Sequence, residues 1–264
     1  MLKLILARIQ QGHRTMAYPG AAPPAMPELF RGRPVIDGSK CPEGCRACAQ
    51  SCPTSAVEIT DRVRLDLGKC LFCSDCADAC PEQAIRYSSD HRLAARRRED
   101  LVIEQDDPEA RLAGALDTRL RKMFGRSLRL RQVSAGGCNA CEADVNVLGT
   151  VGWDLGRFGI QFVASPRHAD GLLLTGPVTR NMELAVKKTY DAVAAPKIVI
   201  AVGACAISGG PYAGHDQVHD GAARVLPVDL HIPGCPPHPL TILDGLLRLL
   251  GRIEDGTRQA PPGA

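Results

Sequence analysis

Residues 70–81 read Cys-Leu-Phe-Cys-Ser-Asp-Cys-Ala-Asp-Ala-Cys-Pro, and residues 41–53 read Cys-Pro-Glu-Gly-Cys-Arg-Ala-Cys-Ala-Gln-Ser-Cys-Pro. The last three cysteines and the proline of the earlier stretch recur 28 residues later, as the pair Cys45 and Cys73 shows (73 − 45 = 28). Only the first cysteine is out of phase, because Cys41 and Cys70 are 29 residues apart (70 − 41 = 29). The segment is therefore an internal duplication with one extra residue between Cys41 and Cys45.

The later stretch is the C-x2-C-x2-C-x3-C-P run of bacterial-type ferredoxins, which hold 4Fe-4S clusters. Three thiolates at this spacing surround one cluster, and the fourth cysteine of each run binds the other cluster. The proline after the fourth cysteine fixes φ and supplies no N–H, which suits a chain that turns out of the loop. We therefore expect one cluster on Cys41, Cys45, Cys48 and Cys80 and a second on Cys70, Cys73, Cys76 and Cys52.

Structural zinc and a disulfide framework are the alternatives. Zinc also binds paired cysteines, but the third cysteine of each run, the Cys-Pro ending and the duplication favour iron-sulfur chemistry. Disulfides belong to oxidising compartments. The apolar stretch Met1–Ile9 is interrupted by Lys3 and Arg8 and has no small-residue cleavage site, so we do not expect a secretory signal.

The length and composition narrow the class of protein. A chain of 264 residues suggests two domains, and 45% hydrophobic residues is ordinary for a globular protein. The longest apolar run, residues 198–207, is too short to cross a bilayer. A net charge of +3 is too small to indicate a nucleic-acid partner.

Residues 101–126 form a polar connector, and beyond it strand and helix patterns alternate. Strands are predicted at residues 128–133, 161–164, 171–175, 197–202 and 228–232. Helices are predicted at residues 182–193 and 239–250. This alternation predicts an α/β domain with a largely parallel sheet.

The four remaining cysteines follow predicted strands of this domain. They are Cys138, Cys141, Cys205 and Cys235. Ligands bind at the carboxyl ends of parallel strands, and the neighbouring glycines allow a bulky inorganic group to approach the backbone. Zinc or unrelated buried thiols are alternatives, but we favour a third 4Fe-4S cluster.

Several longer stretches of this domain match a known family. They are Gly137-Cys-Asn-Ala-Cys-Glu142, Phe162-Val-Ala-Ser-Pro-Arg-His-Ala-Asp170, Thr175-Gly-Pro-Val-Thr-Arg180, Val202-Gly-Ala-Cys-Ala206, Ser208-Gly-Gly210 and Ile232-Pro-Gly-Cys-Pro-Pro237. Residues 126–250 thereby resemble the small subunit of group 4 membrane-associated nickel-iron hydrogenases, which is related to the 20 kDa subunit of respiratory complex I. Residues 1–100, including Phe30-Arg-Gly-Arg-Pro34, resemble the ferredoxin-like (23 kDa type) subunit of the same complexes.

The resemblance implies a fusion of two subunits. We expect an α+β two-cluster ferredoxin-like domain (residues 1–100), a connector (101–126), an α/β flavodoxin-like domain with a mainly parallel sheet (127–255) and a tail (256–264). Cys138, Cys141, Cys205 and Cys235 match the ligands of the cluster nearest the partner's active site. Complex I subunits have adjacent cysteines at the first position, so the Cys138-x2-Cys141 spacing favours the hydrogenase branch. Pro177 and the lack of a G-x-G-x-x-G run argue against nicotinamide binding.

Three further residues have open roles. Glu142 follows the ligand loop and either faces the large subunit as a proton relay or is a carboxylate at a helix N-terminus. Arg180 either offsets the charge of an anionic cluster at an interface or is an exposed loop arginine. His238 stands where such subunits usually carry a smaller or apolar residue, and we expect it to cap a helix or to lie at an interface.

Since three clusters use all twelve cysteines, none remains for nickel, and catalysis must lie on a partner. We expect an electron-transfer subunit of a formate hydrogenlyase or hydrogenase-4-like complex. Its partners would be a large catalytic subunit, either nickel-iron or of the complex I 49 kDa type, and membrane-arm subunits that hold it peripherally on the cytoplasmic side of the inner membrane. A complex I-like quinone or ferredoxin oxidoreductase without nickel is the first alternative, and a zinc-binding scaffold without redox function is the second.

Overall fold

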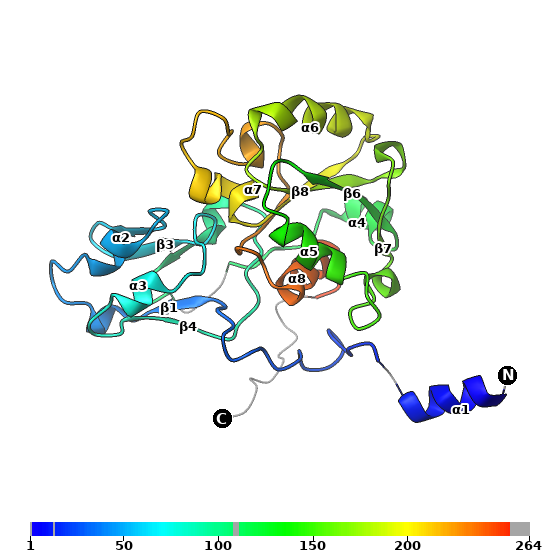
Figure 1. The fold of residues 1–264 in the computed structure, drawn as a ribbon, viewed down its shortest axis with the longest axis horizontal. Helices are drawn as coiled ribbons and strands as arrows, with labels where there is room; N and C mark the ends of the chain where they lie inside the picture. Colours follow the sequence, from blue (N-terminus) through cyan, green and yellow to red (C-terminus); the bar gives the residue numbers. More distant parts are fainter. Residues whose placement is uncertain (1, 13, 108–110, 254–264) are drawn as a thin grey trace.

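Five aliphatic segments form one parallel sheet in the C-terminal region (residues 111–253) of the computed structural model, which describes residues 2–12, 14–107 and 111–253 (Figure 1). The strands are β6 (Leu128–Ser134), β7 (Ile160–Phe162), β8 (Gly171–Thr175), β9 (Ile198–Val202) and β10 (Leu230–Ile232). They differ from the predicted ranges by at most two residues. Every residue of β8 and β9 is buried, as expected for parallel strands covered on both faces. The predicted tail, residues 256–264, lies outside the described residues.

The order of the strands is β7-β6-β8-β9-β10, with every neighbouring pair parallel. Numbered from β6, this is the 2-1-3-4-5 order of flavodoxin-like sheets, whose ligands bind outside the carboxyl ends of the strands near the point where the order reverses. That point lies here between β6 and β8. The topology thus predicts a site at the carboxyl edge, where the four cysteines were expected.

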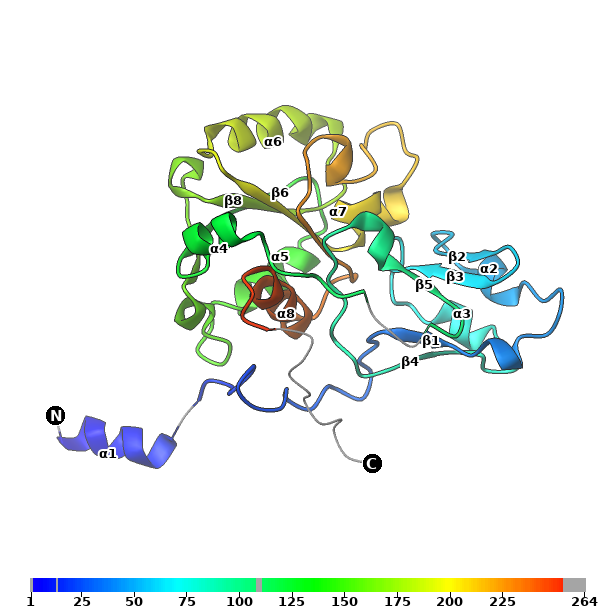
Figure 2. The ribbon, with the colours of Figure 1, turned by 180° about the vertical axis from the view of Figure 1, so that it is seen from behind.

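Helices cover both faces of the sheet (Figures 1 and 2). On one face, α6 (Arg180–Ala192) and α7 (Ala204–Ser208) pack against the side chains of Leu172 and Leu174. On the other face, α5 (Ala140–Val147) and α8 (Pro239–Leu249) pack with Leu173. Both predicted helices are confirmed as α6 and α8, whereas the two short helices that follow β6 and β9 were not expected.

The N-terminal region (residues 14–107) consists of two small antiparallel sheets and two short helices. The pair β1–β4 (Pro34–Ile36 and Ile85–Tyr87) forms one sheet. The other has the order β2-β3-β5 (Val57–Ile59, Val63–Asp66 and Val102–Glu104). The helices are α2 (Ala47–Ser51) and α3 (Asp75–Asp78). Strand β5 lies in the predicted connector, which otherwise contains the end of the 3-10 turn Arg98–Leu101 and α4 (Thr118–Phe124).

A single buried hydrophobic cluster runs from the N-terminal region into the parallel sheet. Leu65 and Leu101 belong to it together with Leu172. Across the same junction, the hydroxyl of Ser208 donates to the carbonyl of Gly68 over 2.8 Å. The two regions therefore share a core, and the division into separate domains stays a prediction.

Two backbone hydrogen bonds join Ala95 to His231 at the outer side of β10. The Ala95 N–H donates to the His231 carbonyl over 3.0 Å, and the His231 N–H donates to the Ala95 carbonyl over 2.8 Å. The chain that leaves the N-terminal region thus runs along the edge of the parallel sheet before it enters that sheet.

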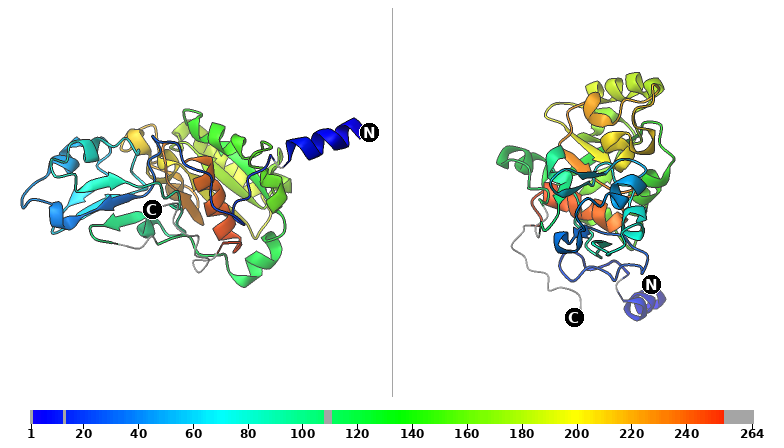
Figure 3. Two further views of the ribbon diagram at one scale, coloured as in Figure 1. Left: turned by 90° about the horizontal axis from the view of Figure 1, so that it is seen from below. Right: turned by 90° about the vertical axis from the view of Figure 1, so that its left-hand side faces the viewer.

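The helix α1 (Leu2–Gln11) lies apart from the rest of the protein (Figures 1 and 3). Five of its large apolar side chains are exposed. Within the part of the chain that the structure describes, the helices are all too short or too polar to cross a bilayer.

Candidate metal centres

The two copies of the duplication form the same hydrogen bond to sulfur. In the first copy the Ala56 N–H donates to the sulfur of Cys52 over 3.1 Å, and in the second the Ala84 N–H donates to Cys80 over 3.3 Å. Both donors come four residues after the cysteine. Such bonds favour the thiolate, which is the form that binds iron.

The backbone conformation of the two copies is also repeated. Ser55 and Gln83, which are equivalent in the duplication, both have φ of 50°. Gly44 and Phe72 are equivalent as well and have φ of 74° and 55°. The extra residue of the first copy therefore lies between Cys41 and Gly44, before the repeated conformation begins.

The first predicted quartet comes together despite this extra residue. Burial raises the pKa of the Cys41 thiol, and the neighbouring Cys80 and Cys45 raise it further. Burial also raises the pKa of Cys48 to about 11, with smaller contributions from Cys41, Cys76 and Cys80. Thiols that shift one another's pKa in this way lie close together. Cys41 thus remains beside its predicted partners.

The second predicted quartet comes together in the same way. Burial raises the pKa of Cys70 to about 12, and nearby Cys76 and Cys52 add to it. Burial likewise raises the pKa of Cys76, to which Cys52 and Cys73 contribute. The fourth cysteine of each run therefore lies with the other run, as the predicted crossing of ligands requires.

Tyr87, at the end of β4, is a contact that sequence reasoning missed. Its hydroxyl lies 3.6 Å from the sulfur of Cys76 and 3.8 Å from that of Cys70. Burial, with the nearby Cys70 and Cys76, raises the pKa of Tyr87, so the phenol is protonated and can donate. The equivalent residue of the first copy is Ile59. A hydroxyl in only one copy was the signal that would have found it.

The third predicted quartet lies at the carboxyl edge of the parallel sheet. Cys138 precedes α5 and Cys141 lies in its first turn, both after β6. Cys205 lies in α7, directly after β9, and Cys235 follows β10. Cys138 and Cys235 are exposed, whereas Cys141 and Cys205 are half-buried.

The pKa shifts show that these four thiols are neighbours. Burial raises the pKa of Cys141, and the charges of Cys205, Glu142, Cys235 and Cys138 raise it further. Burial raises the pKa of Cys205 to about 11, with Cys235 and Cys138 as the next causes. Thiols that lie 64 and 94 residues beyond Cys141 in the sequence (205 − 141 and 235 − 141) are thus brought to one place.

Glycine backbone makes room beside two of these sulfurs. Gly203 has φ of +90°, and a methyl group there would lie 2.5 Å from the sulfur of Cys141. At Gly210, with φ of +56°, a methyl group would lie 2.9 Å from the sulfur of Cys205. A cavity kept open by glycine and lined by four thiols suits a bulky thiolate-bound group such as a 4Fe-4S cluster.

Glu142 lies in the first turn of α5, which agrees with its interpretation as a carboxylate at a helix N-terminus. It is buried and accepts a hydrogen bond of 2.6 Å from the hydroxyl of Thr175. Burial acts to raise the pKa of Glu142, but hydrogen bonds from Ser134 and Thr175 outweigh it and lower the pKa. The carboxylate is therefore ionised at neutral pH, and its role as a relay stays a prediction.

Arg180 and His238 lie on different elements. Arg180 begins α6 and donates through Nε to the carbonyl of Asp216. His238 caps α8, because its Nδ1 accepts from the Leu240 N–H over 3.1 Å, as expected for a capping residue. The interface role of Arg180 stays a prediction.

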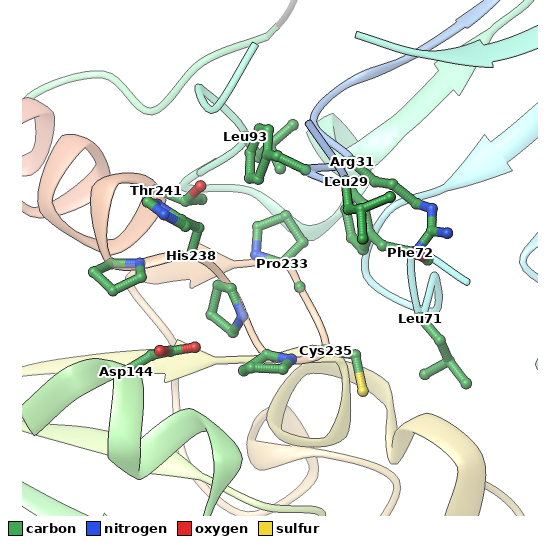
Figure 4. A pocket seen from close by; sticks show the side chains of 15 residues that line it. Leu29, Arg31, Leu71, Phe72, Leu93, Asp144, Pro233, Cys235, His238 and Thr241 are labelled. Atoms are coloured by element: carbon green, nitrogen blue, oxygen red, sulfur yellow. The ribbon is translucent and has the colours of Figure 1, made fainter. Parts of the chain in front are cut away.

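The three quartets lie in series. Cys76 of the second quartet contributes to the pKa of Cys48 in the first, and Cys73 of the second contributes to that of Cys235 in the third, after burial and Cys138. A cavity of about 240 Å³ adjoins Cys235 and is lined by Phe72 from the N-terminal region and by the prolines of the Cys235 loop (Figure 4). The second quartet is thus placed between the other two.

Within residues 2–12, 14–107 and 111–253, the side chains of His, Cys, Asp and Glu form no group of three or more positioned to hold one metal ion. A zinc site would need four such ligands at about 2.0–2.3 Å from the ion. Metal analysis distinguishes zinc from iron directly.

Two family models match the chain. One is described as the 20 Kd subunit of NADH ubiquinone oxidoreductase and matches residues 138–249, which include the whole third quartet. The other is described as a 4Fe-4S binding domain and matches residues 63–86, the second copy of the duplication.

Individual relatives point the same way. A "probable membrane-bound hydrogenase subunit" of Pyrococcus furiosus is 42% identical over 54% of this chain and 87% of its own length. Formate hydrogenlyase subunit 7 of Escherichia coli is 41% identical over 56% of this chain and 58% of its own length. A subunit of the NADH-quinone oxidoreductase of Phocaeicola vulgatus is 41% identical over 54% and 71%. A chain from the structure of membrane-bound sulfane sulfur reductase, an archaeal respiratory membrane complex, aligns with a TM-score of 0.45 and 33% identity over 54% of this chain and 78% of its own.

Proposed function

Because the chain belongs to the family of the 20 kDa subunit of NADH–ubiquinone oxidoreductase, we propose that it is the electron-transfer subunit of a group 4 nickel-iron hydrogenase complex of the formate hydrogenlyase type. In this proposal it carries three 4Fe-4S clusters and fuses a 23 kDa-type ferredoxin-like domain (residues 1–100) to the 20 kDa-like domain (residues 127–255). Residues 101–126 connect the two domains. The active site lies on a large-subunit partner.

The serial arrangement of the thiol quartets carries this proposal. The first and second quartets approach through Cys48 and Cys76, and the second and third through Cys73 and Cys235. When bound, 4Fe-4S clusters supply one-electron redox chemistry. Thiols in series with the second quartet in the middle give electrons a continuous route from the N-terminal region to the carboxyl edge of the parallel sheet.

The protein's own groups hold and adjust these sites. Backbone N–H groups of Ala56 and Ala84 donate to cysteine sulfur, and the Tyr87 hydroxyl lies beside two thiols of the second quartet. Hydrogen bonds to sulfur and exclusion of water are the means by which proteins set cluster potentials. These contacts differ among the three sites, which gives the clusters separate potentials.

The exposed side of the third quartet supports a partner at that face. Cys138 and Cys235 are exposed although their loops are rich in glycine and proline. Partners that form permanent complexes cover such surfaces. We propose that a large catalytic subunit covers it near Glu142 and Arg180, and that membrane-arm subunits hold the assembly peripherally on the cytoplasmic side of the inner membrane.

Metal analysis of the anaerobically purified protein tests the cofactor count. Three quartets should bind about twelve iron and about twelve sulfide per chain. Stoichiometric zinc, which the scaffold alternative predicts, or iron for two clusters only would overturn the proposal.

Ligand crossing has its own test. Cys80→Ser should change the electron paramagnetic resonance (EPR) signal of the cluster held by Cys45 and Cys48 and leave the signal of the cluster held by Cys70 and Cys73 nearly intact. The reverse pattern would show that the fourth cysteine stays with its own run.

Turnover tests the route. In the complex with the large subunit, Cys141→Ser should abolish hydrogen turnover while both N-terminal clusters remain, as judged by iron content and EPR. Retained turnover would remove the third quartet from the path of electrons.

A complex I-like quinone or ferredoxin oxidoreductase is the second candidate, favoured by the 41% identity to a subunit of NADH-quinone oxidoreductase. The large subunit decides between the two. Paired C-x-x-C motifs near both of its ends would supply nickel ligands, and their lack together with quinone reduction by the complex would favour the second candidate.

A further inference from the structure

The helix α1 presents apolar side chains that pack against nothing within the described chain. Leu2, Ile5, Leu6 and Ile9 are exposed by 70%, 54%, 49% and 71%. Single exposed apolar residues are ordinary, but four together on a ten-residue helix are not. This surface therefore has a partner.

The four side chains share one face of the helix. They occupy positions i, i+3, i+4 and i+7, the spacing of an amphipathic helix. At about 100° per residue, Lys3 and Arg8 flank this apolar face on either side, and Leu4 lies on the opposite side. Arg8 donates to the Gly12 carbonyl over 3.2 Å, which holds its stem along the helix.

Charge distinguishes between the candidate partners. The first acidic residue of the chain is Glu28, whereas Lys3, Arg8 and Arg14 are basic. Two copies of such a helix would repel each other, whereas an anionic lipid surface attracts it. Basic residues that flank an apolar face are typical of helices that lie in the membrane interface, because their stems reach the headgroups.

The protein holds the segment after the helix in place. The hydroxyl of Thr15 donates to the carbonyl of Val151 over 2.9 Å, and the Met16 N–H donates to the carbonyl of Gly152 over 3.0 Å. Val151 is itself exposed by 73%. A membrane at α1 would thus lie beside a fixed side of the C-terminal region.

We propose that α1 lies in the surface of an anionic membrane, with Leu2, Ile5, Leu6 and Ile9 among the acyl chains and Lys3 and Arg8 at the headgroups. Four side chains give weak, reversible binding, comparable to one lipid anchor. The helix would orient a protein that its partner subunits already hold at the membrane. This inference concerns a surface apart from the cysteine sites and does not rest on their function.

Sedimentation of the full chain with vesicles tests the proposal. We expect binding to phosphatidylcholine vesicles that contain roughly 30% phosphatidylglycerol, and weaker binding without the anionic lipid or at high salt. The double variant Ile5→Ser/Ile9→Ser should lower the partition coefficient by about tenfold or more. Leu4→Ser is the matched control, because it removes the same kind of group from the opposite side and should have a much smaller effect.

A second variant separates charge from folding. Lys3→Glu/Arg8→Glu should abolish the preference for anionic vesicles, and iron content should stay unchanged in every variant because α1 lies apart from the cysteine sites. Equal binding by the double serine variant and the control, or no binding of the full chain to vesicles, would overturn the proposal. So would a dimer lost in the double serine variant, or binding only to membranes that contain partner subunits, because these outcomes assign the face to protein.

Discussion

The two kinds of cysteine site in this protein are built on different scales. The N-terminal quartets come from two short runs, and their hydrogen bonds to sulfur come from residues four positions away. The third quartet draws on loops after β6, β9 and β10. A local sequence shapes the first kind, whereas the third site exists only when the parallel sheet has assembled. The third site should therefore be the more sensitive to changes in the fold.

The largest effect is expected at Gly203. Gly203→Val places a side chain where a methyl group would already lie 2.5 Å from the Cys141 sulfur. Iron should fall from about twelve to about eight per chain, with both N-terminal signals kept in EPR spectra. Gly214→Val is the control, because Gly214 also has positive φ, at +81°, but has no atom within 4 Å of the added group. Equal loss of iron in both variants would attribute the effect to backbone strain.

A cavity in the sheet should separate the two kinds of site by stability. Leu173 is fully buried between β8 and the face covered by α5 and α8. Leu173→Ala should lower the free energy of unfolding of the C-terminal region by about 2–5 kcal/mol. In denaturant, the third cluster should then be lost before the other two, as followed by visible absorption and EPR. Leu184→Ala, on the exposed side of α6, should change little, and simultaneous loss of all clusters would contradict the comparison.

Tyr87 distinguishes the two N-terminal sites from each other. Tyr87→Phe removes a hydroxyl 3.6 Å from the Cys76 sulfur and makes the second copy resemble the first, which has Ile59. Because a hydrogen bond to sulfur stabilises the reduced cluster, the potential of the second cluster should fall by roughly 40 mV, the equivalent of about 1 kcal/mol. A redox titration followed by EPR measures it. The first cluster serves as the internal control, and an equal shift in both would assign the effect to general solvation.

The smallest effect is expected at His238, which caps α8 behind the Cys235 loop. His238→Ala should cost about 1 kcal/mol of unfolding free energy, because the Leu240 N–H loses its acceptor. His238→Asn keeps an acceptor and should recover most of this loss in chemical denaturation. If the asparagine variant is as unstable as the alanine variant, the ring contacts with Phe30 and Trp153 matter more than the cap.

Sequence reasoning predicted the features that are encoded locally. The buried strands β8 and β9 are continuous aliphatic runs, and the cysteine spacings indicated all three groups of thiols. The grouping of Cys138 and Cys141 with Cys205 and Cys235 followed from placing each after a strand of one parallel sheet.

Features that depend on distant contacts were missed. Strand β5 was expected to be part of a connector, because three residues are too few to show alternation and their pairing with β3 is visible only in three dimensions. Tyr87 was missed because its hydroxyl meets Cys70 and Cys76 across a turn of the chain. Helix α5 was not predicted, since Asn139, at φ of +72°, and the ligand loop before it mask the helical pattern.

The hydrogen bonds between Ala95 and His231 also bear on the solubility of the chain. Alternation along β10 turns one of its three residues, His231, outward, and both backbone groups of that residue are bonded to Ala95. An open strand edge is a template on which another chain can add a strand and begin to aggregate. Here the chain closes that side of its largest sheet with its own backbone, so that the outward-facing backbone groups of His231 are already taken when a second molecule approaches.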